Sequence, residues 1–179
     1  MSDSPVTNIV FGGLGGQGVL KASDILADAA VRAGFDVKKS ELHGMSQRGG
    51  SVSSDVRFGA RVFSPMVPAG EADFLVILTP DQVEPNRHVL REGGGLILPD
   101  AVSADLLLNR KSLNVALLGV LSRQLPIAEE HWLAALRANL AEKLHDANVQ
   151  AFNLGRASGK GVSSVAPTGM KIAQPFKAG

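Results

Sequence analysis

The chain has 179 residues, of which 45% are hydrophobic and 20% are charged, with 18 basic against 17 acidic side chains. This composition is typical of one globular domain. The balanced charge and the seven Phe and single Trp argue against nucleic-acid binding, which needs a basic surface and aromatic stacking platforms.

Membrane insertion and metal binding are also not expected. No apolar run reaches the roughly 18 residues of a membrane span. The polar start, Met1 to Thr7, lacks a signal-peptide pattern, so we expect a cytoplasmic protein. Cysteine is absent, which removes the usual ligands of iron–sulfur clusters. The four histidines lack the spacing of a metal site.

The first predicted unit is a strand, a glycine turn, a helix and a second strand. Residues 8–11 form an apolar run that we expect to stop at Gly12. Residues 17–33 place apolar side chains on one helical face, and Gly34 stands where a helix commonly ends. Residues 36–41 then predict the second strand. This order is typical of the first half of a mononucleotide-binding fold.

The central part of the chain predicts three more strands and one helix. Residues 51–58 alternate between apolar and polar, as in a strand with one wetter face. Residues 72–78 are almost continuously apolar, as in a parallel strand buried on both faces. Thr79, with Pro80 and Gln82 behind it, predicts a capped helix start. We expect Pro85 to limit or kink this helix, the glycines at 93–95 to end it, and residues 96–98 to form a strand.

The last third predicts helices and a tail. Residues 113–125 are apolar nearly all round, which predicts a helix buried in the domain or under a partner. Residues 128–144 are amphipathic, and residues 148–154 predict a short final helix. Residues 156–179 are rich in Gly, Ser, Lys and Pro and cannot build a core, so we expect them to dock on another subunit.

Together these elements predict an α/β fold. The alternation of strands and helices favours a Rossmann-like domain of three layers, with a mostly parallel sheet between helices. We assign residues 1–155 to this domain and residues 156–179 to an extended C-terminal tail.

The glycine turn matches the phosphate-binding pattern G-x-G-x-x-G between a strand and a helix. Its glycines permit close approach to an anion, and the helix behind them offers free N–H groups. The alternative is close packing of strand on helix with no ligand. A dinucleotide site would also need an acidic ribose partner, for which Glu41 is the candidate, although a solvated loop-edge Glu is the simpler interpretation. The candidate cofactor-binding residues of the turn are Gly13, Gly15, Gly16, Gln17 and Gly18.

A polar loop from His43 to Gly50 is the second candidate site. His43 could act as a general acid or base, or donate a hydrogen bond to a substrate carboxylate. Arg48 could bind a carboxylate or phosphate through two parallel hydrogen bonds. Ser46 and Gln47 are further candidates for cofactor binding. The alternative is that these side chains only tie the loop down or form a subunit contact.

These segments together resemble one family. The turn followed by Ser-Glu-Leu-His-Gly-Met-Ser-Gln-Arg-Gly-Gly-Ser-Val at 40–52 is similar to the gamma domain of the 2-oxoacid:ferredoxin oxidoreductases. It is most similar to the small (beta) subunit of the indolepyruvate type. The similarity extends over residues 8–155 and includes Val56-Arg57-Phe58-Gly59, the stretch 114–119 and Ala151-Phe152-Asn153-Leu154-Gly155.

The resemblance implies a subunit of an enzyme complex that is inactive alone. Such complexes oxidatively decarboxylate a 2-oxoacid with coenzyme A, giving an acyl-CoA, CO2 and low-potential electrons. Thiamine diphosphate, Mg2+ and [4Fe-4S] clusters would sit on partner subunits, and the electrons would go to ferredoxin or to an NAD-reducing subunit. The glycine turn and the His43 loop would then face the active-site cleft or coenzyme A.

The substrate and two other functions stay open. The connection between residues 98 and 113 is short for the indolepyruvate type, and the tail is an addition. The substrate could therefore be an aryl pyruvate or an aryl glyoxylate such as phenylglyoxylate. The alternatives to the complex subunit are a free-standing dinucleotide-binding oxidoreductase and a purely structural assembly subunit.

Overall fold

The computed structural model describes residues 5–44, 49–159 and 161–165. In this part of the chain a six-stranded sheet has the order β2-β3-β1-β4-β5-β6. Strands β1, β4 and β5 are mutually parallel, whereas β3 is antiparallel to both β1 and β2, and β6 is antiparallel to β5. The sheet is therefore mixed, with β1, β2, β4 and β5 running in one direction. The strands are β1 (Thr7–Leu14), β2 (Asp36–His43), β3 (Ser51–Gly59), β4 (Ala72–Ile77), β5 (Leu90–Ile97) and β6 (Ser163–Ser164).

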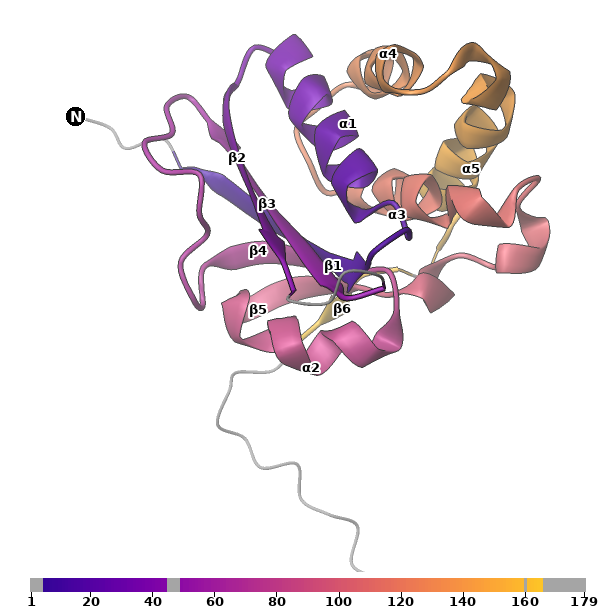
Figure 1. The fold of residues 1–179 in the computed structure, drawn as a ribbon. Coiled ribbons are helices and arrows are strands. Elements are labelled where there is room, and N and C mark those ends of the chain that lie inside the picture. Colours follow the sequence, from indigo (N-terminus) through magenta and orange to yellow (C-terminus); the bar gives the residue numbers. More distant parts are fainter. Residues whose placement is uncertain (1–4, 45–48, 160, 166–179) are drawn as a thin grey trace, which may run out of the picture.

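Helices cover the sheet unequally (Figure 1). The longer helices pack over one face: α1 (Val19–Arg32), α3 (Leu113–Ser122), α4 (Glu129–Asn139) and α5 (His145–Ala157). The opposite face carries the short helix α2 (Val83–Asn86) and the connection between β3 and β4, with a smaller core that includes Val10, Val67 and Ile77. The predicted α/β fold is confirmed. Among the described residues no helix is long and apolar enough to cross a membrane.

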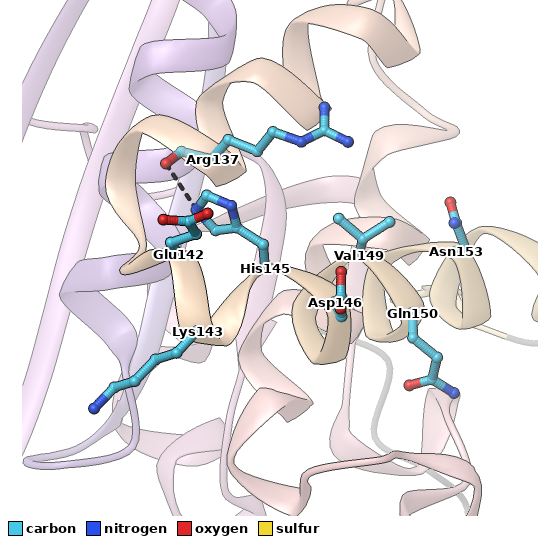
Figure 2. A pocket seen from close by; sticks show the side chains of 8 residues that line it. All are labelled: Arg137, Glu142, Lys143, His145, Asp146, Val149, Gln150 and Asn153. Atoms are coloured by element: carbon cyan, nitrogen blue, oxygen red, sulfur yellow. Dashed lines mark hydrogen bonds between the residues drawn. The ribbon is translucent and has the colours of Figure 1, made fainter.

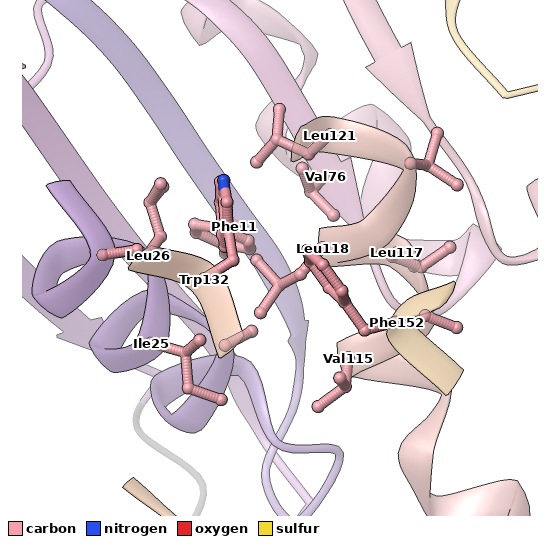
Figure 3. Packing of buried hydrophobic residues seen from close by; sticks show 14 of the residues in the cluster. Phe11, Ile25, Leu26, Val76, Val115, Leu117, Leu118, Leu121, Trp132 and Phe152 are labelled. Carbon is pink, nitrogen blue, oxygen red and sulfur yellow. The ribbon is translucent and has the colours of Figure 1, made fainter. Parts of the chain in front are cut away.

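The main core lies between the sheet and the longer helices. Trp132 of α4 is fully buried and belongs to the same cluster as Phe11 of β1 and Leu118 of α3 (Figure 3). Every residue of α3 from 114 to 122 is buried, so the predicted buried helix is confirmed, and it is covered by the domain itself. Its contact with α5 depends on Gly119 and Gly155. A Cβ at Gly155 would lie 1.9 Å from the carbonyl oxygen of Ala116.

Strand β3 changes the first predicted unit. The strand after α1 does not lie beside β1, because β3 pairs along the whole of β1 on one side and β2 on the other. Polar and apolar residues alternate along β3, which suits a strand placed between β1 and β2 with a different environment on each face. Val56 and Phe58 belong to the helix-side core, while Asp55 and Arg57 point to the other face. There Asp55 accepts a hydrogen bond from the Val67 N–H (2.8 Å), and Arg57 donates to the Ser64 carbonyl (2.9 Å). Burial raises the pKa of the Asp55 carboxyl above its ordinary value.

The region after β4 corrects two predictions. Thr79 makes no side-chain capping bond, and only short helical turns follow, with Pro85 in α2 as the last but one residue. The glycines at 93–95 do not end a helix, because they lie within β5. The β4–β5 register shifts at this point, and a Cβ at Gly95 would lie 2.7 Å from the Phe74 ring. Glycine is needed at position 95 because the backbone of the irregular strand lies directly against the Phe74 ring.

Two helix ends differ from the predictions. The stretch 128–144 is broken, because α4 ends at Asn139, whose Nδ2 donates to Asp28 and to the Ala135 carbonyl. Helix α5 is longer than predicted and reaches Ala157. Beyond it β6 pairs with β5 at the sheet edge, Ser164 opposite Gly95. The tail was predicted at 156–179, but residues 156–157 complete α5 and residues 163–164 join this chain's own sheet. Residues 166–179 lie outside the described residues, and docking of the tail on a partner stays a prediction.

Candidate functional site

The glycine turn joins β1 to α1. Strand β1 does not stop at Gly12 as expected, because its pairing with β3 continues to Leu14 opposite Ser51. The Leu14 carbonyl then accepts the Gln17 N–H (3.1 Å), which closes the turn. Gly16 has φ +87° and Gly18 has φ +84°, backbone conformations that a residue with a Cβ rarely adopts. Helix α1 begins directly after Gly18, so its first N–H groups lie at the turn.

The turn was interpreted either as a ligand-binding turn or as close packing of strand on helix, and each interpretation applies to different residues. At Gly13 a Cβ would lie 2.8 Å from Val19 and 2.9 Å from the Gln17 side chain, so this glycine serves strand–helix packing. Gln17 is also turned inward, because its Oε1 accepts the Leu14 N–H (2.8 Å). Gly16, in contrast, has no atom within 4 Å of a Cβ position. The open side of the turn at Gly16 is therefore where a ligand has room.

Asn114 completes the turn and was not singled out as a site residue from the sequence. It is the second residue of α3, and its Nδ2 donates to the Gly18 carbonyl (3.1 Å) across 96 residues of chain. A Cβ at Gly18 would lie 2.4 Å from this Nδ2. The sequence did offer one signal for this residue, because Asn114 is a polar side chain at the start of an otherwise apolar helix.

The His43 loop is closed at its base, and its last residue contacts the turn. The Gly15 N–H donates to the Gly50 carbonyl (2.9 Å), and the Gly44 N–H donates to the Ser51 carbonyl (2.6 Å). His43 is the last residue of β2, and its side chain is 58% exposed. Three predicted site residues, Ser46, Gln47 and Arg48, lie outside the described residues. The structure therefore brings His43 to the glycine turn, and the binding roles of the loop stay predictions.

Two hollows flank the turn. One, of about 410 Å3, has both apolar and polar walls and contains the predicted residue His43. The other, of about 370 Å3, is lined by Gly16–Gly18, by the basic residues Arg110 and Lys111, and by Leu78 and Leu113. The first hollow is lined by Leu14, Gly15, Gly16, Gly18, Val19, Leu20, Lys21, His43 and Val52. The two hollows share Gly16 and Gly18, so a single elongated ligand lying over the turn could contact residues of both hollows.

A chain of charges runs along β2 to His43. Lys39 Nζ donates to Asp24 (2.6 Å) and to Glu41. Burial opposes the charge on Lys39, but these two hydrogen bonds outweigh it and raise the pKa of the ammonium group. The Lys39 hydrogen bond in turn lowers the pKa of the Glu41 carboxyl. Glu41 Oε2 lies 3.8 Å from His43 Nε2, so the carboxylate faces the imidazole.

Glu41 is poorly placed to bind a ribose at the turn. In a dinucleotide-binding fold the acidic residue ends the strand next to the one that carries the glycines. Here β3 lies between β1 and β2, so Glu41 is two strands away from the turn. Its ion pair with Lys39 gives it a local role within β2 and α1.

A larger hollow, of about 940 Å3, lies where α4 meets α5 (Figure 2). It is built by different elements from those of the glycine turn. His145 Nε2 lies 2.9 Å from the Leu140 carbonyl and 3.1 Å from that of Arg137, so the imidazole satisfies carbonyls left free at the end of α4. The hollow is also lined by the basic residues Arg137 and Lys143 and by the acidic residues Glu142 and Asp146. We assign this hollow a structural role at the helix junction.

Within the described residues, no group of three or more His, Asp or Glu side chains could hold a metal ion.

Comparisons with known proteins agree with this geometry. Residues 8–106, which include the turn and His43, match the model of the pyruvate ferredoxin/flavodoxin oxidoreductase family. The indolepyruvate oxidoreductase subunit IorB of Thermococcus kodakarensis is 36% identical over 195 aligned positions, which cover 86% of this chain and 96% of that protein. The corresponding subunit of Methanothermobacter thermautotrophicus is 30% identical, with 83% and 95% covered.

Solved structures share the fold. The gamma subunit of a keto/oxoacid ferredoxin oxidoreductase from Geobacter sulfurreducens superposes with a TM-score of 0.71 at 24% identity, over 83% of this chain and 95% of that one. A 2-oxoglutarate:ferredoxin oxidoreductase from Magnetococcus marinus, solved with 2-oxoglutarate, coenzyme A and succinyl-CoA, gives 0.76 at 20% identity, over 90% of this chain and 32% of that one. The chain belongs to the pyruvate ferredoxin/flavodoxin oxidoreductase family, as a small subunit of the gamma type.

Proposed function

We propose that this chain is the gamma-type subunit of a thiamine-diphosphate-dependent complex. The complex would oxidise a 2-oxoacid with coenzyme A, releasing CO2 and two electrons and forming an acyl-CoA. The observation that carries the proposal is the glycine turn with an open ligand side at Gly16, in a chain that matches a named oxidoreductase subunit over almost its whole length.

Coenzyme A is the ligand that we assign to the turn. It carries a pyrophosphate and a further phosphate, and the turn offers helix N–H groups for such anions. Arg110 and Lys111 add two positive charges on the far wall of the same hollow. Both side chains can reach a phosphate from solvent, because Arg110 and Lys111 are the two exposed residues of the 3-10 turn at 110–112. A phosphate between two cations and a helix start is a favourable arrangement.

His43 has a separate proposed role. In the first hollow it lies beside apolar side chains, including Val52, and Glu41 faces its ring. We assign it a hydrogen bond to the substrate carboxylate, or proton transfer at the substrate, with Arg48 as a second carboxylate or phosphate ligand. These residues would act only when a partner subunit brings the oxoacid to this edge of the domain.

The cofactors would belong to partner subunits. Thiamine diphosphate with Mg2+ would supply the stabilised carbanion, and [4Fe-4S] clusters would carry the electrons to ferredoxin or to an NAD-reducing subunit. The chain has no cysteine with which to bind such clusters. We therefore expect the isolated chain to be inactive, and we expect the complex to work in the cytoplasm.

An aryl side chain on the oxoacid is the substrate class we propose. The relatives named above are subunits of indolepyruvate oxidoreductases, which supports an aryl pyruvate. An aryl glyoxylate such as phenylglyoxylate is the second candidate. The free-standing dinucleotide enzyme is less favoured, because Glu41 is separated from the turn by β3. A purely structural subunit is less favoured, because it gives no role to the hollow in which Gly16 lies with the basic residues Arg110 and Lys111.

The test is reconstitution with a thiamine-binding, cysteine-rich partner subunit. We expect coenzyme A-dependent reduction of a viologen dye by indolepyruvate or phenylglyoxylate only when both chains are present. His43→Ala should lower kcat/KM for the oxoacid by at least about tenfold. His131→Ala, on α4, is the matched control and should not change it. Micromolar binding of NAD to the isolated chain would favour the dinucleotide enzyme instead, and unchanged kinetics in the His43 variant would reduce the loop to scaffolding.

A further inference from the structure

We propose that Asn114 is a positioning residue that holds the glycine turn in its ligand-binding conformation. The inference rests on the proposed function for the nature of the ligand, but the contact itself is independent of it. Asn114 is only 7% exposed and is surrounded by the buried residues of α3. A buried amide is costly unless its polar atoms are bonded. Both ends of this amide are bonded.

The two ends of the amide bond to different elements. Oδ1 accepts the Val115 N–H (2.9 Å), which satisfies a free donor at the start of α3. Nδ2 donates to the Gly18 carbonyl (3.1 Å). The same carbonyl accepts the Ala22 N–H (3.0 Å), the first hydrogen bond of α1. The Gly18 carbonyl therefore accepts one hydrogen bond from its own helix and one from α3. These two bonds fix the orientation of the peptide groups of the glycine turn.

Asn114 and Gly18 depend on each other. A side chain at residue 18 would occupy the space of the Asn114 amide, at 2.4 Å from a Cβ. A smaller residue at 114 would leave the Gly18 carbonyl with one partner. The segment that leads into Asn114 also carries Arg110 and Lys111. The amide contact thus sets the separation between the basic wall and the glycine wall of the 370 Å3 hollow.

Asn114→Asp isolates the contact to Gly18. The carboxylate keeps the acceptor for Val115 and suits a helix start, so α3 should be retained. It loses the donor and turns a negative oxygen toward the Gly18 carbonyl. Asn148→Asp is the matched control, because Asn148 is 6% exposed, lies in the first turn of α5 as its fourth residue and donates to the Leu144 carbonyl (2.8 Å), away from the glycine turn.

Two measurements separate the inference from the proposed function. In the full-length isolated chain, hydrogen exchange at the Gln17 N–H, which bonds to Leu14, and at the Ala22 N–H, which bonds to Gly18, should be at least about tenfold faster in Asn114→Asp than in Asn148→Asp, as expected for loss of one buried hydrogen bond. In the reconstituted complex, the KM for coenzyme A should rise by about tenfold or more with little change in kcat. Lower pH should reverse this rise, because a protonated carboxyl can donate again.

The outcomes differ in what they overturn. Unchanged exchange at the N–H groups of Gln17 and Ala22 rejects the positioning role of Asn114. Faster exchange with an unchanged KM for coenzyme A keeps the positioning role and rejects coenzyme A as the ligand of the turn. An equal rise in KM in both variants would show a general effect of a buried carboxylate, and that result also rejects the inference.

Discussion

The α3–α5 contact and the glycine turn use the same residue type for opposite reasons. In the contact, Gly119 and Gly155 are needed because two helix backbones touch, and a Cβ at either would lie about 2 Å from a carbonyl oxygen. In the turn, Gly16 is needed for its positive φ and faces open space. Gly119 and Gly155 therefore serve packing, as Gly13 does in the turn, whereas Gly16 leaves room. The following variants test this distinction, in order of their expected effect on stability.

Gly155→Ala should cause the largest loss. The added methyl group would lie 1.9 Å from the Ala116 carbonyl oxygen, and the backbone there is flanked by fully buried Phe152. We expect a loss of about 3 kcal/mol or more in the free energy of unfolding, because overpacking a rigid core forces the helices apart. Urea denaturation of the isolated chain measures it. A loss below about 1 kcal/mol would mean that α3 and α5 separate easily, and would contradict the packing explanation.

Gly16→Ala and Gly34→Ala should cost equal, smaller amounts. Both glycines have positive φ, +87° and +92°, and neither has an atom within 4 Å of a Cβ position. Each substitution should therefore cost about 1–2 kcal/mol from backbone strain alone. Gly34 lies after α1, away from both hollows that flank the turn, so only Gly16→Ala should raise the KM for coenzyme A. Equal kinetics in the two variants would mean that the open side of the turn binds nothing.

The double variant Arg110→Ala with Lys111→Ala should leave stability almost unchanged. Among the residues that the structure describes, Arg110 pairs with exposed Asp105 in a surface ion pair, which contributes little. The KM for coenzyme A should nevertheless rise, and the dependence of this KM on salt should weaken, because two charges near the phosphates are lost. Steady-state kinetics at two ionic strengths measure both effects. Arg87→Ala, in an exposed pair with Glu84, provides the control.

The residue pattern along the chain predicted those elements in which a run of apolar residues is buried. Strand β4 and helix α3 are of this kind, because their apolar runs are buried as expected. The place of β3 was missed, since strand order depends on pairing between distant segments. The glycines of β5 were assigned to a helix end, because a residue pattern does not show that Phe74 will pack on Gly95.

The candidate site was predicted in part for a similar reason. The turn and His43 follow strand ends, and strand ends in an α/β sheet lie at a common edge. The structure brings them into one hollow. Gln17 was predicted to bind a cofactor. Its amide oxygen accepts a hydrogen bond from the Leu14 N–H within the turn, and its binding role stays a prediction. Arg110, Lys111 and Asn114 come from a distant segment, and only the tertiary fold brings them to the turn.

The position of β3 between β2 and β1 has a consequence for how the chain can vary in length. Its partners on both sides are paired residue by residue, from Thr7 opposite Phe58 to Leu14 opposite Ser51, and from Asp36 opposite Gly59 to His43 opposite Val52. One inserted residue within β3 would turn Asp55 and Arg57 toward the helices and Phe58 away from them. Insertions that relatives carry should therefore fall in the connections around β3, and the strand itself should keep a constant length.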